Sequence, residues 1–318
     1  LNSEIYVDKS LIIQNLNKIV NTENKFICTS RPRRFGKSMT LKMLNAYYSC
    51  GCDSKELFQS LKISKSDTFE KYLNKFNVIY LDLNQFISID GTVKELLNNL
   101  QIKVIRELKR YCPDTQYIDW SDLPTALDEI YYETEKKFVV LIDEWDSIFR
   151  FFKDNTTAHK EYLDFLRYMF KGRDYVSLVY MTGILPIKKY GVHSALNMFT
   201  EISMLNPREY AEFTGFTEQE VKELCNQYNM DFEETKRWYN GYNLKGISIY
   251  NPRSVVMSLT GKDFDNYWTQ TETYEALKVY ITMNFDGLRD VITQLIAGGS
   301  YKIDTSTFSN DMSTFHNL

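Results

Sequence analysis

Residues 25–38 read KFICTSRPRRFGKS: a short apolar run, a basic turn and the start of a helical pattern. The last three residues, Gly36-Lys37-Ser38, match the end of the phosphate-loop pattern, GxxxxGK followed by Ser or Thr. The first glycine of that pattern is missing, because Arg31 occupies its place. A helix that begins near Gly36 directs unpaired N–H groups and its positive dipole end toward the turn, which favours a bound anion. The stretch therefore predicts a strand, a phosphate-binding loop and a helix in succession.

The residues of this loop have expected roles. Gly36 lets the backbone approach an oxyanion closely, Lys37 reaches the β and γ phosphates, and the Ser38 hydroxyl ligates Mg²⁺. Arg33 or Arg34 could touch the γ-phosphate or serve the structure, and the sequence favours neither. The alternative is a basic loop before a solvated helix, but four positive charges within seven residues repel one another unless an anion neutralises them. We expect the nucleotide-contacting residues of the loop to be Arg33, Arg34, Phe35, Gly36, Lys37, Ser38 and Met39.

A second motif follows later in the chain. Residues 138–142 form an apolar strand pattern that ends in Asp143-Glu144. Asp143 would hold Mg²⁺ opposite Ser38, and Glu144 would orient and deprotonate an attacking water. A strand that runs into an ordinary polar turn is the alternative. The order of the two motifs instead predicts a P-loop NTPase, and the adjacent Asp and Glu place it in the ATPase branch with an additional central strand. For Asp146 we favour a helix N-cap over a role near the metal.

The fold class follows from apolar runs that alternate with helical patterns. This alternation predicts an α/β fold, with a mostly parallel five-stranded sheet flanked by helices. Thr182 ends the fourth predicted strand, where it would sit beside the γ-phosphate and sense hydrolysis. Its alternative is a β-branched residue at a strand end. The predicted strands are residues 25–29, 77–83, 137–142, 176–182 and 199–205.

The pattern changes after the fifth strand, which sets the predicted domains. Residues 1–205 form the P-loop ATPase core. Residues 206–260 form a small helical lid, in which Thr217 and Glu220 make a capping box at a helix start. Residues 261–318 read as a helical linker or the start of a truncated C-terminal domain.

Composition and charge bound the class of protein. The 318 residues are 43% hydrophobic with only 6 Pro and 13 Gly, which is typical of a folded chain. A net charge of −4 excludes a globally basic nucleic-acid binder, although a local basic patch is compatible with it. No apolar run approaches the roughly 18 residues of a membrane span. Five scattered cysteines suggest reduced thiols in a cytoplasmic protein. The first residue is Leu rather than Met, which suggests a fragment.

Together these motifs resemble the predicted AAA-ATPase-like family of bacteria and archaea, over about residues 4–270. The arginine at position 31 matches the distinctive phosphate loop of that family, and Trp145 stands where a tyrosine is usual. The matching blocks are residues 6–9, 31–38, 141–146, 182–187, 213–220, 238–242 and 250–254.

The resemblance implies an ATPase core followed by a small helical lid. Tyr6 and Asp8 could form an adenine pocket, but Asp8 could equally cap a helix start. Arg253 could reach the nucleotide as a sensor or lie on the surface. Members of the family often carry a C-terminal PD-(D/E)XK nuclease-like domain. The final 60 or so residues lack a strand with the acidic and Lys pattern of such a site, so we expect that effector to lie outside this chain.

The predicted function is therefore ATP binding and Mg²⁺-dependent hydrolysis, as a regulatory or motor module for an effector. Two alternatives stay open: a nucleotide-gated switch that does not hydrolyse, and a DNA-binding interaction module. The sequence has no Asn-Lys-x-Asp motif of GTPase type, which favours ATP over GTP. DNA and a nuclease-like effector are partners by family analogy only, no membrane partner is expected, and a homo-oligomer stays open.

Overall fold

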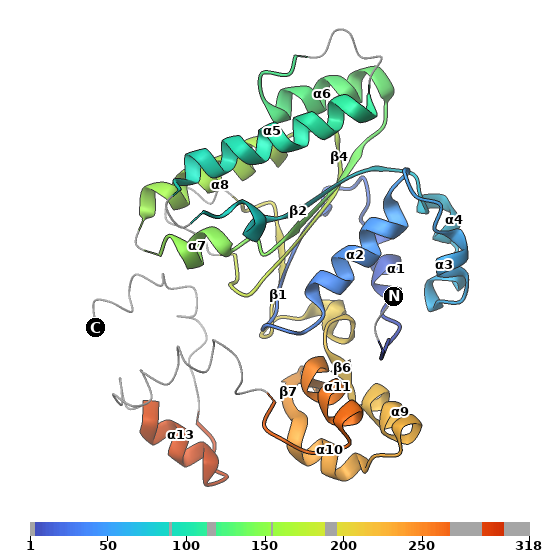
Figure 1. Ribbon diagram of the computed structural model, residues 1–318, viewed down its shortest axis with the longest axis vertical. Helices are drawn as coiled ribbons and strands as arrows, with labels where there is room; N and C mark the ends of the chain where they lie inside the picture. Colours follow the sequence, from blue (N-terminus) through green and yellow to red (C-terminus); the bar gives the residue numbers. More distant parts are fainter. Residues whose placement is uncertain are drawn as a thin grey trace.

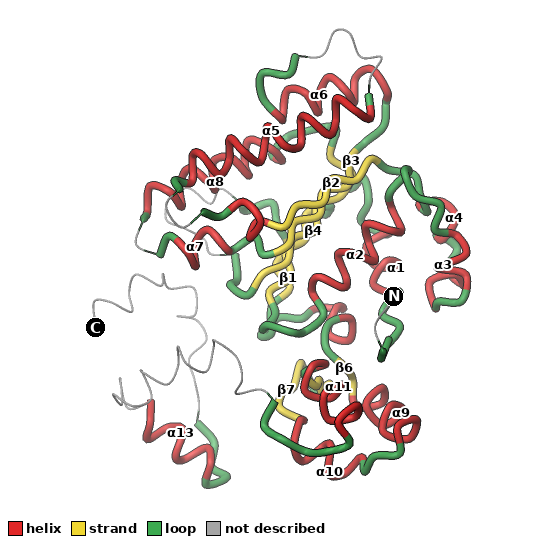
Figure 2. The backbone as a smooth tube through the Cα atoms, viewed as in Figure 1, coloured by secondary structure: helices red, strands yellow, loops and turns green. Residues whose placement is uncertain are grey.

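The computed structural model describes residues 4–88, 91–112, 119–153, 155–187, 196–267 and 288–301. Its main sheet has the strand order β2-β3-β4-β1-β5, and every neighbouring pair of strands is parallel (Figures 1 and 2). The predicted α/β class, with five parallel strands flanked by helices, is confirmed. The strands are β1 (Phe26–Ser30), β2 (Asn77–Asp82), β3 (Phe138–Asp143), β4 (Val176–Gly183) and β5 (Thr200–Ile202).

The central strand β4 separates the strand that precedes the phosphate loop from the strand that ends in Asp143. This is the additional strand expected of the ATPase branch. The register pairs Asp82 with Asp143 between β2 and β3, and Ser30 with Gly183 between β1 and β4. The carboxyl ends of these strands therefore meet at one edge of the sheet, where ligands bind in open α/β sheets.

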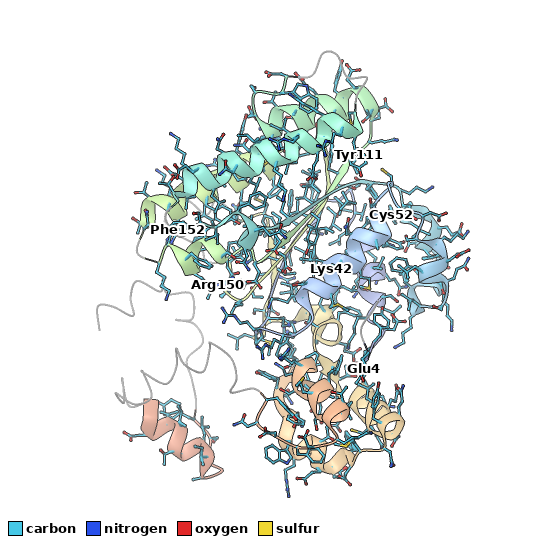
Figure 3. All side chains as sticks on the ribbon, in the orientation of Figure 1. Glu4, Lys42, Cys52, Tyr111, Arg150 and Phe152 are labelled. Atoms are coloured by element: carbon cyan, nitrogen blue, oxygen red, sulfur yellow. The ribbon has the colours of Figure 1, made fainter. Side chains whose placement is uncertain are left out.

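Helices cover both faces of the sheet, and side chains fill the space between the layers (Figure 3). Along β1, Phe26 and Cys28 face one apolar core while Ile27 faces the other, as the two-residue period of a strand requires. Short 3₁₀ helices occupy Lys62–Lys65, Leu83–Phe86 and Arg208–Phe213. The first core is covered by α5 (Val93–Tyr111), α6 (Leu123–Thr134), α7 (Ser147–Phe151) and α8 (Thr156–Phe170), and the second by α1 (Leu11–Asn17), α2 (Lys37–Tyr48), α3 (Lys55–Gln59) and α4 (Phe69–Tyr72).

Residues 216–261 form a small unit beyond the end of the sheet, which we call the lid (orange in Figure 1). The predicted capping box is present, because Thr217 and Glu220 each accept from the other's backbone N–H. The lid was expected to be helical, but it also contains an antiparallel sheet of order β6-β8-β7. Its elements are β6 (Phe216–Thr217), α9 (Glu218–Tyr228), α10 (Phe232–Tyr239), β7 (Asn240–Leu244), β8 (Ile247–Tyr250) and α11 (Pro252–Gly261).

Residues 5–9, which we call the N-terminal segment, pack against the lid, whereas α1 after them packs against the sheet. Ile5 is buried in the apolar core of the lid with Val221 and Leu259. The Lys9 ammonium donates to the Glu212 carbonyl at 2.5 Å and pairs with the Glu220 carboxylate at 2.6 Å. The lid is therefore joined to the rest of the chain by the N-terminal residues Ile5 and Lys9 as well as by its own connection after β5.

The region beyond the lid lies mostly outside the described residues. Within it, α13 (Leu288–Ile296) is a single amphipathic helix. Of the predicted linker or truncated domain at 261–318, residues 268–287 and 302–318 lie outside the described residues. Among the described helices, none combines the length and the apolar character needed to cross a bilayer.

Candidate nucleotide-binding site

A cavity of about 700 Å³ lies between the phosphate loop, the N-terminal segment and the lid. Its lining residues include an apolar group, which we call the apolar half, and a polar or charged group, which we call the polar half. Both kinds of surface are suited to a base joined to phosphates. The apolar half includes Ile5, Tyr6, Val7, Met39, Met43, Phe213, Phe216, Pro252 and Val256. The polar half includes Arg33, Arg34, Gly36, Lys37, Ser38, Asn84, Glu144 and Arg150.

The phosphate loop turns into α2 at Gly36, whose φ of +86° is a conformation that glycine adopts without strain. Lys37 is only 5% exposed, and its ammonium donates to the carbonyls of Arg31 at 3.1 Å and Pro32 at 3.0 Å. Burial lowers the pKa of the Lys37 ammonium, and the Glu144 carboxylate opposes that shift. The Lys37 side chain therefore crosses the inside of the phosphate loop, and its ammonium lies near the Glu144 carboxylate.

Arg31, at the position of the missing glycine, is turned away from the cavity and is 1% exposed. Its Nε donates to the Thr214 hydroxyl at 2.8 Å, and its Nη1 donates to the carbonyls of Ser30 at 3.0 Å and Ile202 at 3.2 Å. Burial lowers the pKa of Arg31 to about 10, so the group stays charged at neutral pH. The expectation of four clustered charges around an anion is thus wrong for Arg31, which ties the loop to β5 and to Thr214, two residues before the lid.

Replacing Arg31 with methionine is expected to lower the free energy of unfolding by about 1–3 kcal/mol, because three buried acceptors lose a donor. The loss is limited because Nη2 of Arg31 has no hydrogen-bond partner among the described residues, and methionine removes that desolvated group. Urea denaturation followed by circular dichroism measures the change. An unchanged midpoint would contradict the anchoring role, and Arg31→Lys should retain part of the stability.

Phe35 joins the loop to the lid. Phe35 borders the cavity, but its ring is buried. The ring meets the Tyr242 ring edge-on, with centroids 5.0 Å apart. The Phe35 carbonyl accepts from the Gly215 amide at 3.1 Å. Gly215 has a φ of +85°, and a Cβ added there would lie 2.4 Å from Cγ2 of Ile249. The Phe35 ring packs against Tyr242 and Ile249 of the lid, so it is not available for the predicted nucleotide contact.

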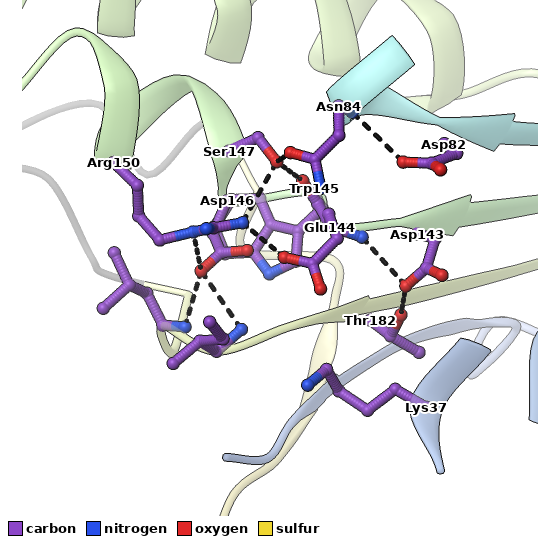
Figure 4. Close-up of polar contacts among 12 residues, drawn as sticks. Lys37, Asp82, Asn84, Asp143, Glu144, Trp145, Asp146, Ser147, Arg150 and Thr182 are labelled. Atoms are coloured by element: carbon purple, nitrogen blue, oxygen red, sulfur yellow. Dashed lines mark hydrogen bonds and ion pairs between the residues drawn. The ribbon is translucent and has the colours of Figure 1, made fainter. Parts of the chain in front are cut away.

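Asp143 lies just behind the cavity wall, at 3% exposure. Its Oδ1 accepts from the Thr182 hydroxyl at 2.6 Å and from the Glu144 amide at 3.0 Å, which leaves Oδ2 as a ligand atom (Figure 4). Thr182 is buried, so it orients Asp143 instead of facing the cavity as predicted. The described residues hold no cluster of three or more metal-ligating side chains. One carboxylate and the Ser38 hydroxyl nevertheless fit Mg²⁺, which takes most of its ligands from phosphate and water.

Glu144 faces the cavity and adopts a φ of +52°, which is rare for a residue with a side chain. Burial raises the pKa of the Glu144 carboxyl, and the cations of Arg150 and Lys37 oppose part of this rise. The carboxylate forms an ion pair with Arg150 (Figure 4). Glu144 thus lines the cavity, and the Arg150 guanidinium holds its carboxylate.

Sequence reasoning missed Arg150 and Asn84. Asn84 follows the end of β2 and accepts from the Ser147 hydroxyl at 2.6 Å. The sequence could have indicated Asn84, because it follows a predicted strand and the carboxyl ends of parallel strands lie at the same edge of the sheet. Asp146 sits at the N-cap position of α7 as favoured, but its side chain makes no capping bond; instead, its Oδ2 accepts from the amides of residues 184 and 185.

Tyr6 and Asp8 have different surroundings. Tyr6 lines the apolar half of the cavity, and burial raises its pKa to about 12. The Asp8 carboxylate accepts from the amides of Ser10 at 2.8 Å and Lys62 at 2.7 Å, away from the cavity wall. These contacts agree with the alternative role of Asp8 at a helix start. Arg253, at the start of α11, lines the cavity.

Comparison with known proteins places this geometry in context. The chain is 27% identical, over 258 residues, to a protein of Azotobacter chroococcum mcd 1 described as an uncharacterized protein in the vnfD 5' region. That alignment covers 77% of this chain and 47% of the relative, so the chain spans just under half of the relative's length. Among solved structures, PCH-2 of C. elegans matches 74% of this chain and 47% of its own, with 12% identity and a TM-score of 0.28.

A family model described as a predicted AAA-ATPase matches residues 2–193, which include the phosphate loop, Asp143 and Glu144. This match covers more than half of the chain and supports a nucleotide-binding, ATPase-like function. The chain belongs to the predicted AAA-ATPase family.

Proposed function

We propose that the chain binds ATP with Mg²⁺ in this cavity and hydrolyses it. The observation that carries the proposal is a single cavity that joins an apolar half to a phosphate loop and to Glu144. Lys37 and the first amides of α2 neutralise the phosphates. Ser38 and Asp143 would hold the metal, which draws negative charge from the phosphates.

The hydrolytic step requires a base that reaches water beside the γ-phosphate. Glu144 has that place, since it is the carboxylate on the cavity wall opposite Lys37. It would take a proton from the attacking water while the bond to the leaving phosphate oxygen breaks. Thr182 acts indirectly, because its hydroxyl fixes the orientation of Asp143.

The base end of the cavity favours adenine. Aliphatic and aromatic side chains, including Tyr6, Phe216 and Val256, supply flat apolar contact. Arg253 also lines the cavity from the lid side, so bound ATP would contact both lid and core. We propose that hydrolysis changes how the lid packs on the core and so regulates or drives an effector. That effector is nuclease-like by family resemblance alone.

A nucleotide-gated switch without turnover is the second candidate, because the ion pair with Arg150 holds Glu144. The DNA-binding alternative is less favoured by the geometry. Arg31 and Lys37, two of the four basic residues that suggested it, are buried and hydrogen-bonded to protein carbonyls.

The test is phosphate release from ATP by the purified chain, with Mg²⁺ and with EDTA, beside binding of a fluorescent ATP analogue. We expect binding, Mg²⁺-dependent release and weaker binding of GTP. Tight binding without release, with and without added DNA, would favour the switch. Binding of DNA with a steep salt dependence but not of ATP would favour the interaction module.

A further inference from the structure

Arg150 lies where a catalytic arginine would be needed. It comes from α7, the helix that directly follows Asp143 and Glu144, and it lines the polar half of the cavity. Its guanidinium pairs with the carboxylates of Glu144 and Asp146 (Figure 4). An arginine is thus already inside the proposed ATP site, on the same chain as Lys37.

The stem side of this arginine faces a fixed carboxylate. Asp146 is fully buried, and its Oδ2 forms an ion pair with Nε of Arg150 at 3.3 Å, without a hydrogen bond. The same Oδ2 accepts hydrogen bonds from the amides of Ile184 at 3.1 Å and Leu185 at 2.8 Å. The Ser147 hydroxyl accepts from Nη2 of Arg150 at 3.1 Å. Asp146 therefore faces the stem of Arg150 at Nε, whereas Nη2, which contacts both Ser147 and Glu144, is the end that would change partner.

The pair with Glu144 sets up a competition. A carboxylate held by a guanidinium is shielded from water and poorly placed to take a proton. The γ-phosphate of ATP carries more negative charge than one carboxylate and binds guanidinium groups through two oxygens. A phosphate that enters the polar half would therefore draw Arg150 from Glu144.

We propose that Arg150 is the catalytic arginine of this site and acts in cis. In the free chain it holds Glu144; with ATP bound, it contacts the γ-phosphate and releases Glu144 to the attacking water. Water oxygen then bonds to the γ-phosphorus, the bond to the β–γ bridging oxygen breaks, and Glu144 takes the water proton. Arg150 stabilises the charge on the transferred group, so no arginine from a second subunit is required. This inference rests on the proposed hydrolysis of ATP.

The first test compares wild type with Arg150→Ala, Arg150→Lys and the control Arg173→Ala. Arg173 also pairs with a carboxylate, that of Asp128, but lies away from the cavity. A catalytic arginine is worth about 10³–10⁵-fold in turnover. We expect Arg150→Ala to lower kcat at least 100-fold, with ATP binding within about fivefold of wild type, and Arg150→Lys to recover part of the rate. Arg173→Ala should keep the wild-type rate.

A second readout separates catalysis from structure. ADP with aluminium fluoride imitates the transferred phosphoryl group, so Arg150→Ala should lose tight binding of this complex while it still binds ATP. An unchanged or increased kcat in Arg150→Ala would overturn the proposal and leave only an inhibitory contact. Equal losses of ATP and ADP–aluminium fluoride binding would also overturn it, because they indicate a structural role.

Mixing variants tests the cis assignment. Lys37→Ala keeps Arg150 but should not bind ATP, whereas Arg150→Ala binds ATP without the arginine. If Arg150 acts in cis, the mixture stays inactive; recovered turnover would show an arginine supplied between subunits. Phosphate release by the wild type is measured first. If the wild type releases no phosphate, the proposed hydrolysis itself fails. If both the wild type and Arg150→Ala are active, only this inference is overturned.

Discussion

Replacing Glu144 with glutamine is expected to reduce phosphate release by about 10²–10⁴-fold while ATP binding persists. Glutamine keeps the shape of the side chain but cannot accept the proton of the attacking water. The amide also weakens the ion pair with Arg150, so the loss reflects missing chemistry rather than a base that stays shielded. Single-turnover phosphate release and ATP-analogue binding measure the two effects separately.

The control for this variant is Glu133→Gln, an exposed glutamate on α6. It should match wild type in both measurements. A Glu144→Gln chain that turns over normally would show that another group activates water. A variant that no longer binds ATP would assign Glu144 to binding or to the shape of the loop.

Lys37→Ala is expected to weaken ATP binding at least 100-fold, an effect of about 3 kcal/mol for a buried charge-assisted contact with phosphate. Because burial lowers the pKa of this ammonium, an anion beside it is especially favourable. The substitution also removes the donors to the carbonyls of Arg31 and Pro32, which should cost stability by about 1 kcal/mol each.

Lys42→Ala is the matched control, since Lys42 lies on the same helix and is exposed (labelled in Figure 3). Isothermal titration with ATP and Mg²⁺ distinguishes the two variants, and thermal unfolding checks that both are folded. If Lys37→Ala bound ATP as tightly as wild type, the phosphate-loop assignment would fail.

Much of the fold could be predicted because buried parallel strands are short, continuous apolar runs. All five predicted strands lie in the main sheet. The lid sheet was missed because β6 has two residues and β7 is mostly exposed, so neither carries an apolar period. These strands form because of the neighbouring strands with which they pair, and a local sequence pattern carries no information about those neighbours.

The candidate site was likewise predictable in part from the sequence. Motif positions identified Lys37, Ser38, Asp143 and Glu144, because strand ends and a helix start place them. The direction of individual side chains could not be predicted. Arg31 points into the protein and Thr182 binds Asp143, and both contacts depend on neighbours from distant parts of the chain.

The packing of Ile5 in the lid has a consequence for synthesis. Its partner Leu259 lies about 250 residues later, and a ribosome that adds roughly 5–20 residues per second needs some 12–50 seconds to reach it. During that interval the N-terminal segment cannot close the apolar half of the cavity. The nucleotide site is therefore completed near the end of translation of the described core and lid.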